Sequence, residues 1–200
     1  MRLRRAYWKH EGGFTLIEVM VTIIIMGILA TIATSMWFGA VEGRRVDSAT
    51  NQLAADLRLA HSSASNRLTQ YRVAYVSGGN ISCAGMSATA ADPEARPDYC
   101  LLRQRIDPVS GAITYEQTAA RFLPEQTVIS GTGLNVDATI SALLGSAGTR
   151  TLRFNADGSA ASGGGLAVGA DIRVTVASDD GAPSHILDVN PATSRIKIDP

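Results

Sequence analysis

The sequence predicts an α+β protein in which a long N-terminal helix packs on a mainly antiparallel β-sheet head. Three observations support this prediction. An apolar run over residues 14–33 contains a single charge, Glu18. Apolar residues then recur at helical spacing as far as Leu68. After Arg67 the pattern changes to short β-branched or alternating segments separated by turn residues. The composition, 46% hydrophobic and 18% charged, is ordinary for a folded chain.

The first thirteen residues are basic. They contain four positive residues and one acidic residue, whereas the formal net charge of the whole chain is zero. Removing residues 1–13 would therefore leave a net charge of −3. The basic charge belongs to a targeting segment and not to the folded part. Positive residues ahead of an apolar run place the N-terminus on the cytoplasmic side of a membrane.

The apolar run is long enough to span a membrane. As a helix, residues 14–33 would extend about 30 Å, the thickness of the hydrocarbon core. A cleaved secretory signal has a shorter apolar region and a small-residue cleavage site. A plain single-pass anchor explains the length but leaves Glu18 unexplained, because a charge at the bilayer centre costs about 2.5–3.5 kcal/mol.

A third interpretation accounts for the glutamate. The segment Gly-Phe-Thr-Leu-Ile-Glu, residues 13–18, resembles the prepilin cleavage and methylation motif of type IV pilins and type II secretion pseudopilins. The resemblance implies that a prepilin peptidase cleaves between Gly13 and Phe14 and that the new amine of Phe14 is methylated. It also implies that Glu18 pairs with the Phe14 amine of a neighbouring subunit during filament assembly. Such pairing would remove much of the cost of the buried carboxylate and would help to set the axial register.

The helical pattern continues beyond the membrane segment. One apolar stripe at helical period consists of Val46, Ala49, Leu53, Leu57, Ala60, Ala64 and Leu68. The other faces carry polar residues: Arg44, Arg45, Asp47, Gln52, Asp56, Arg58 and Arg67. The first proline is Pro93, so a single helix of about 50 residues is expected, with a soft point at Gly39 and Gly43. Four parts follow: a leader peptide over 1–13, a transmembrane helix half over 14–38, an amphipathic half over 39–68 and a β-rich head over 69–200.

The head is expected to consist of short strands. Their predicted ranges are 71–76, 100–106, 112–116, 127–130, 151–155, 171–177, 186–190 and 195–198. A hairpin turn is expected at residues 107–111, and a second turn follows the strand that ends near Asn155. Residues 84–98 and 159–165 are predicted to be loops, the latter a flexible connection between two strands.

The two cysteines, Cys83 and Cys100, lie at the ends of the first of these loops. An even pair in an exported chain is consistent with a disulfide, and two unlinked buried thiols are the alternative. The late segments "FNADGSAASGG", "DIRVTVAS" and "ILDVN…SRIKI" resemble the C-terminal half of GspH/FimT-type minor pseudopilins. Some relatives have a glycine before the final arginine, where this chain has Ser194. Any function tied to that motif is therefore in doubt.

No grouping of residues indicates an enzyme, a cofactor site or a metal site. His10, His61 and His185 are scattered, the last in an expected turn after Pro183. DNA binding, known in some minor pilins, would use Arg195 and Lys197, with Arg150, Arg153 and Arg173. The net charge of −3 and the strand alternation of Arg153 and Arg173 argue against it.

The sequence thus predicts a minor pilin or pseudopilin that assembles into a type II secretion pseudopilus or a type IV pilus, at or near a filament tip. The alternatives are a DNA-binding minor pilin and a plain membrane-anchored extracytoplasmic domain. The expected partners are other pilin subunits, the prepilin peptidase, an inner-membrane assembly platform and the membrane itself. The expected location is the cytoplasmic membrane, with a single span and an extracytoplasmic head, and later the filament.

Overall fold

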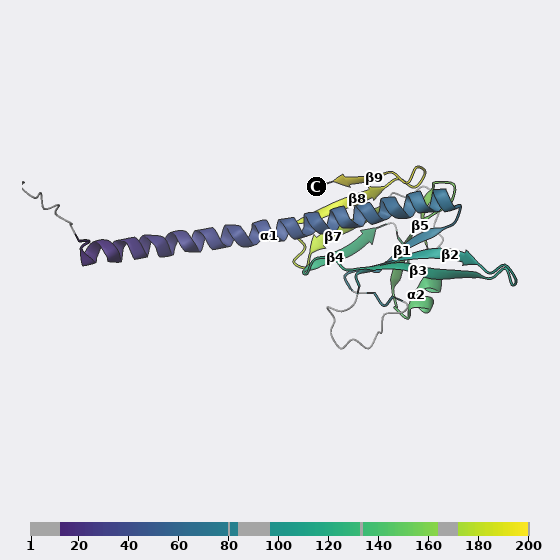
Figure 1. Cartoon of the computed structure of the whole chain (residues 1–200), viewed down its shortest axis with the longest axis horizontal. Coiled ribbons are helices and arrows are strands. Elements are labelled where there is room, and N and C mark those ends of the chain that lie inside the picture. The colour runs from purple at the N-terminus through teal and green to yellow at the C-terminus, as the bar shows by residue number, and fades with distance from the viewer. Residues whose placement is uncertain (1–12, 80, 84–96, 133, 164–171, 200) are drawn as a thin grey trace, which may run out of the picture. The chain divides into compact units, whose positions relative to one another are not determined.

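The computed structural model describes residues 13–79, 81–83, 97–132, 134–163 and 172–199 (Figure 1). Most of the predicted leader and most of the predicted loop at 84–98 therefore lie outside the described residues. The chain divides into two compact units, residues 1–41 and 42–200, which are considered separately below.

Helix α1 runs from Leu16 to Arg67 without a break (Figure 1). Its part in the first unit is apolar, and the large apolar side chains from Leu16 to Phe38 are exposed. It meets the length and hydropathy criteria for a membrane span, with a mean hydropathy of 2.5 over the best window. The helix continues through Gly39 and Gly43 because the segment contains no proline.

The second unit contains two antiparallel sheets. Sheet A has the order β3-β2-β1-β5-β6 and sheet B the order β4-β7-β8-β9. The strands of sheet A are β1 (Tyr71–Val76), β2 (Tyr99–Ile106), β3 (Ile113–Arg121), β5 (Thr149–Phe154) and β6 (Ala160–Ser162). Those of sheet B are β4 (Thr127–Thr132), β7 (Ile172–Ser178), β8 (Ser184–Val189) and β9 (Ile196–Asp199). A short helix, α2 (Ala138–Leu144), follows β4.

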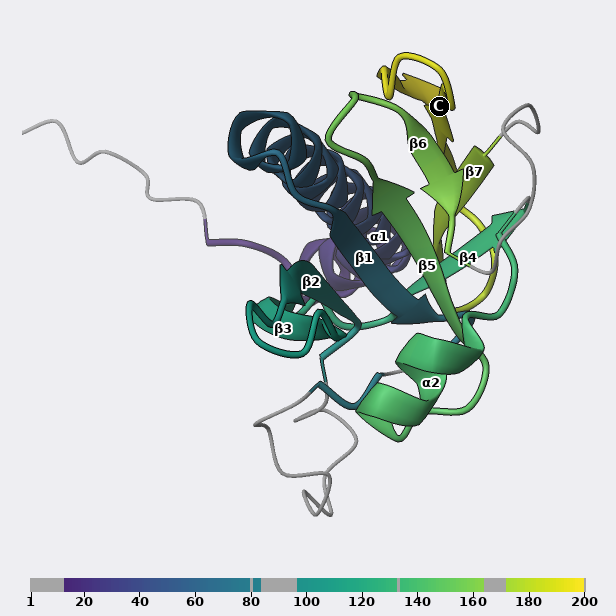
Figure 2. The same cartoon turned by 90° about the vertical axis from the view of Figure 1, so that its right-hand side faces the viewer.

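The main core lies between the second half of α1 and both sheets. Helix residues from Val46 to Ala64 share one hydrophobic cluster with residues such as Val73 and Phe154 of sheet A and Val174 and Leu187 of sheet B. A smaller cluster on the other face of sheet A joins α2 to the strands. Sheet A is therefore covered by α1 on one face and by α2 on the other (Figure 2). This arrangement confirms the predicted α+β class.

Cys83 and Cys100 form a disulfide with Cα atoms 6.2 Å apart. Both residues belong to the smaller cluster, beside Ile140 of α2. The bond joins the segment that follows β1 to the start of β2, which agrees with the prediction of a disulfide over that of two free thiols.

The predicted strands all have counterparts, but two elements were missed. Residues 160–162 were assigned to a flexible loop and instead form β6, with Phe154 opposite Ala160 in an antiparallel pair. Helix α2 was assigned no structure. Its signals are local: the Asp137 side chain accepts a hydrogen bond from the Ile140 N–H, and Gly145 ends the helix in the left-handed conformation.

Two residues of the amphipathic helix differ from the prediction. Leu68 was placed on the apolar stripe, but the helix ends at Arg67 and the Leu68 side chain is 79% exposed. Its φ of 49° turns the chain toward β1. Asp56 was placed on a polar face and is buried, because strands β2 and β3 supply partners for its carboxylate.

Candidate processing and assembly site

The predicted cleavage position lies just ahead of α1. Residues 13–15 are not helical, and the helix begins at Leu16. Gly13 has no atom within 4 Å of the place where a Cβ would stand, and the Phe14 side chain is 81% exposed. The peptide bond between Gly13 and Phe14 is therefore part of a non-helical, uncovered segment of the kind that a protease active site can accept.

Thr15 begins the helix by capping it. Its hydroxyl oxygen accepts a hydrogen bond from the Glu18 N–H at 3.3 Å, and its carbonyl accepts from the N–H groups of Glu18 and Val19. Thr15 and Glu18 stand at the spacing of a capping box, in which the third helical residue is acidic. A carboxylate in the first turn also interacts favourably with the positive end of the helix dipole. The glutamate thus has a local reason to be here, which the sequence analysis missed although the Thr-x-x-Glu spacing signals it.

The carboxylate of Glu18 is exposed, as are the apolar side chains around it. Within the described residues it has no side-chain partner. The helix positions one acidic group near its start and surrounds it with an uncovered apolar surface. A cation from outside the described residues could pair with it there.

A buried polar cluster ties α1 to sheet A. The Asp56 carboxylate accepts hydrogen bonds from the Tyr99 hydroxyl at 2.8 Å and from Arg121 Nε at 2.8 Å. Burial, together with the hydrogen bond to Asp56, raises the pKa of Tyr99 well above its usual range, so its hydroxyl remains protonated and donating. The hydrogen bond to Asp56 likewise raises the pKa of Arg121.

A second group of polar contacts lies where α1 enters the head. Arg45 donates to the Gln126 side chain at 2.5 Å, Asp47 lies 2.6 Å from His185 Nε2, and Ser178 donates to Glu42. His185 was expected in a turn but lies in strand β8, and its ring faces the helix. These contacts fix the first turns of the head helix against sheet B.

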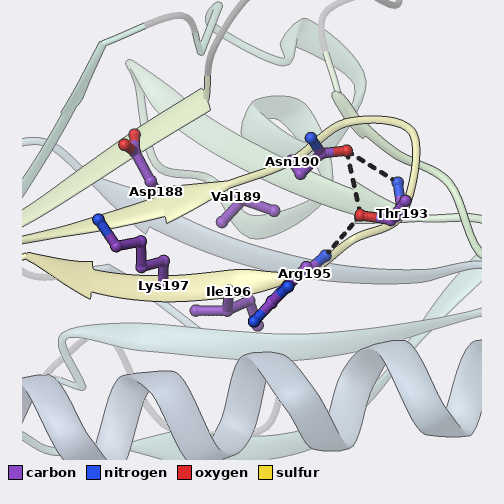
Figure 3. A pocket seen from close by; sticks show the side chains of 7 residues that line it. All are labelled: Asp188, Val189, Asn190, Thr193, Arg195, Ile196 and Lys197. Carbon is purple, nitrogen blue, oxygen red and sulfur yellow. Dashed lines mark hydrogen bonds between the residues drawn. The ribbon is translucent and has the colours of Figure 1, made fainter.

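The candidate DNA-contacting residues are not gathered into one basic surface. Arg195 and Lys197 line a hollow of about 610 Å³ at the β8–β9 turn (Figure 3). Lys197 pairs with Asp199 at 2.5 Å, a contact that raises the pKa of the lysine, and Asp188 stands opposite it on β8. Arg173 pairs with Asp188 at 2.9 Å.

The remaining two candidates lie on the other sheet. Arg150 and Arg153 are in β5, and Arg150 donates to the backbone carbonyls of Gly131 and Leu134. Lys197 and Arg173 are thus paired with carboxylates, and Arg150 holds backbone carbonyls of the fold. In the part of the chain that the structure describes, no three His, Cys, Asp or Glu residues are placed to hold a metal ion.

Comparison with known proteins bears on the N-terminal site. Residues 8–34 match the family described as "Prokaryotic N-terminal methylation motif". This range contains Gly13, Phe14 and Glu18 together with most of the apolar run. The start of the chain therefore matches this methylation motif. In this chain the matched motif lies at the start of a long helix, which is followed by antiparallel sheets.

One solved structure that is similar to this chain is the type IV minor pilin FimU of Pseudomonas aeruginosa. The two share 16% sequence identity with a TM-score of 0.44, and the match covers 80% of this chain and 91% of that chain. No curated protein matches the sequence.

Proposed function

We propose that this protein is a minor pilin or pseudopilin, a non-catalytic structural subunit of a type II secretion pseudopilus or a type IV pilus. The observation that carries the proposal is the methylation motif over residues 8–34 on an uncovered apolar helix. A disulfide-bonded β head is consistent with an extracytoplasmic location. The late strand segments favour a subunit of the GspH/FimT type.

In this proposal the prepilin peptidase cleaves between Gly13 and Phe14 and the amine of Phe14 is methylated. The basic leader keeps the N-terminus on the cytoplasmic side, where the peptidase acts. Removing the leader creates a new positive charge four residues ahead of Glu18. Both groups of the later ion pair thus come from the same short segment.

Assembly then uses Glu18 as an acceptor for the amine of a neighbouring subunit. Inside a filament the apolar helices would exclude water, so an unpaired carboxylate would be costly and a paired one tolerable. The charge pair would therefore favour one axial offset between neighbours. The inner-membrane assembly platform and the other pilin subunits are the remaining partners of this scheme.

The experiment that tests the proposal is N-terminal sequencing and intact-mass measurement of the membrane-extracted protein from its native host. A chain that begins at Phe14 and is heavier by one methyl group is expected. A chain that still begins at Met1 would return the protein to the class of plain membrane anchors. A start well beyond residue 33 would make it a secreted β domain, and the filament proposal would fall.

A further inference from the structure

The apolar stretch at the start of α1, which contains one charged residue, is longer than the hydrocarbon core of a membrane. Glu18 is the only charged residue over residues 14–41, a stretch of 28 residues that extends about 42 Å as a helix. The hydrocarbon core is about 30 Å thick, equivalent to about 20 residues. Hydropathy alone therefore allows the helix to slide by several residues. Glu18 could lie at the inner surface or one to two turns inside the bilayer.

The far end of this stretch contains a group of large side chains suited to the membrane interface. Met36, Trp37 and Phe38 are consecutive and are 73%, 69% and 72% exposed. The residues just before them are polar, and the hydroxyls of Thr34 and Ser35 donate to helix carbonyls. Tryptophan concentrates at membrane–water interfaces, because its ring is apolar while its indole N–H needs a polar partner. The first charged residues of the head helix follow at Glu42.

The geometry points to Met36, Trp37 and Phe38 as an interfacial anchor that binds the boundary between phospholipid headgroups and acyl chains on the outer side. The anchor fixes the register of the helix. Trp37 and Glu18 are 19 residues apart, which is about 28 Å along the helix axis. With the indole at the outer boundary, Glu18 lies at the opposite boundary of the hydrocarbon core.

This register has an energetic consequence for the membrane-held subunit. At the boundary the Glu18 carboxylate remains in contact with water, so it avoids the cost of a charge at the bilayer centre. Burying Glu18 would require the helix to slide outward, which would push Trp37 into the water on the outer side and lose its interfacial position. The anchor therefore keeps the Glu18 carboxylate hydrated until the subunit is extracted from the membrane. The inference rests on the membrane-held state in the proposed function, but not on cleavage, methylation or filament formation.

The depth of Trp37 can be measured directly. The sequence has two tryptophans, Trp8 and Trp37, so the full chain with Trp8→Phe contains a single fluorophore. The protein is reconstituted at low density in phosphatidylcholine vesicles brominated either near the headgroups or near the acyl-chain ends. We expect at least twofold stronger quenching by the shallow bromines. Stronger quenching by the deep bromines, or none by either, would overturn the inference.

A matched control moves the fluorophore along the helix. The chain with Trp8→Phe, Trp37→Phe and Leu29→Trp carries its indole about 12 Å deeper, and the deep bromines should quench it more strongly. If neither brominated lipid quenches Trp37 until the protein is diluted in the membrane, a second copy of the chain, and not lipid, covers the anchor. This outcome would also contradict the inference.

The register itself is tested with introduced thiols. Cys83 and Cys100 form a disulfide, so within the described residues an introduced cysteine provides the free thiol that a maleimide can modify. In unsealed membranes a water-soluble maleimide should modify Glu18→Cys at least tenfold faster than Ile25→Cys. Combining each with Trp37→Leu and Phe38→Leu should reduce that ratio, and an unchanged ratio would contradict the anchor. A chain that keeps Met1 yet passes these tests would refute the proposed function alone.

Discussion

Asp56 is a carboxylate that helical spacing places on a solvent-facing side of α1, yet it is only 7% exposed. Its partners, Tyr99 and Arg121, come from strands 43 and 65 residues further along the chain. No local pattern predicts such an encounter. The sequence does place Asp56 directly before Leu57 of the apolar stripe, so its side chain lies at the edge of the buried face.

Replacing Asp56 with alanine should destabilise the head. The substitution leaves the buried Tyr99 hydroxyl without its acceptor, a loss of about 1–3 kcal/mol. Arg121 contributes less because its side chain is 39% exposed and water can replace the bond. Urea unfolding of the full chain in detergent, followed by circular dichroism, measures the change.

Asp47→Ala is the matched control on the same helix. The Asp47 side chain is 60% exposed, so losing its contact with His185 should cost about 0–1 kcal/mol. Equal losses for the two variants would mean that the Asp56 cluster has no special role in holding the helix.

The hairpin turn between β2 and β3 should loosen at acid pH. The Val109 N–H, and then the Ser110 hydroxyl and N–H, hydrogen-bond the Asp107 carboxylate and hold its pKa below the usual aspartate range. A lowered pKa in the folded state means that the stabilisation is present above the unfolded pKa of about 3.9 and is lost as pH falls through the folded value. Amide chemical shifts of Val109 and Ser110 should titrate in that lower range.

Asp107→Asn is the control for this titration. An amide oxygen can accept the same turn hydrogen bonds but does not ionise, so the two amide shifts should become independent of pH in the acid range. A titration that persists in the variant would assign the effect to another carboxyl group.

At the scale of the elements, Gly131 in β4 of sheet B lies against the Tyr75 side chain of β1 in sheet A. A Cβ there would overlap the Tyr75 hydroxyl of β1 and would lie 3.1 Å from the Arg173 carbonyl of β7. We expect Gly131→Ala to lower the unfolding free energy by about 1–3 kcal/mol through overpacking. Thermal or urea unfolding of the full chain in detergent measures the loss.

Gly79→Ala is the corresponding control. The nearest atom to its added methyl group is a Val76 methyl at 3.7 Å, an ordinary contact distance. Its effect should stay within about 0.5 kcal/mol. A similar loss at both positions would indicate a general cost of alanine in these segments and not a collision between sheets.

The elements that the sequence predicted are those whose signals are local. Alternation and turn residues identified strand β7 and the β2–β3 hairpin, and helical spacing identified the buried face from Val46 to Ala64. Strand β6 has three small residues, Ala160, Ala161 and Ser162, so no alternation marks it. It becomes a strand only because β5 lies beside it. The assignment of strands to two sheets depends on long-range pairing, which no local pattern contains.

For the whole molecule, the motif at the start of α1 could be recognised from sequence and the Thr-x-x-Glu spacing signals its capping role, whereas the uncovered state of the Glu18 carboxylate required the structure. The candidate basic surface shows the opposite case. Arg173 and Lys197 are cations in the sequence, but the pairing of β7, β8 and β9 places Asp188 between them. Counting charges could not reveal that neutralisation.

Replacing Glu18 with alanine should leave membrane insertion and leader cleavage intact and reduce incorporation into filaments at least tenfold. The physical reason is the loss of the acceptor for the amine of a neighbouring subunit, while the apolar length is unchanged. Comparing cell-surface filament fractions with total membrane protein measures incorporation.

Thr22→Ala, one helical turn further along, is the control for this prediction. The Thr22 hydroxyl donates to the Val19 carbonyl within its own helix, so its removal should leave incorporation near normal. Normal incorporation of the Glu18→Ala variant into filaments would refute the assembly role of Glu18.

The order of the strands along the chain has a consequence for folding during synthesis. The apolar face of α1, complete at Ala64, is covered in part by strands that begin only at Ile172. At about 5–20 residues per second of synthesis, that face waits on the order of ten seconds for its last cover. An apolar helix face that stays exposed for this long is prone to aggregation. We expect the nascent chain to depend on a holding chaperone until the final strands emerge.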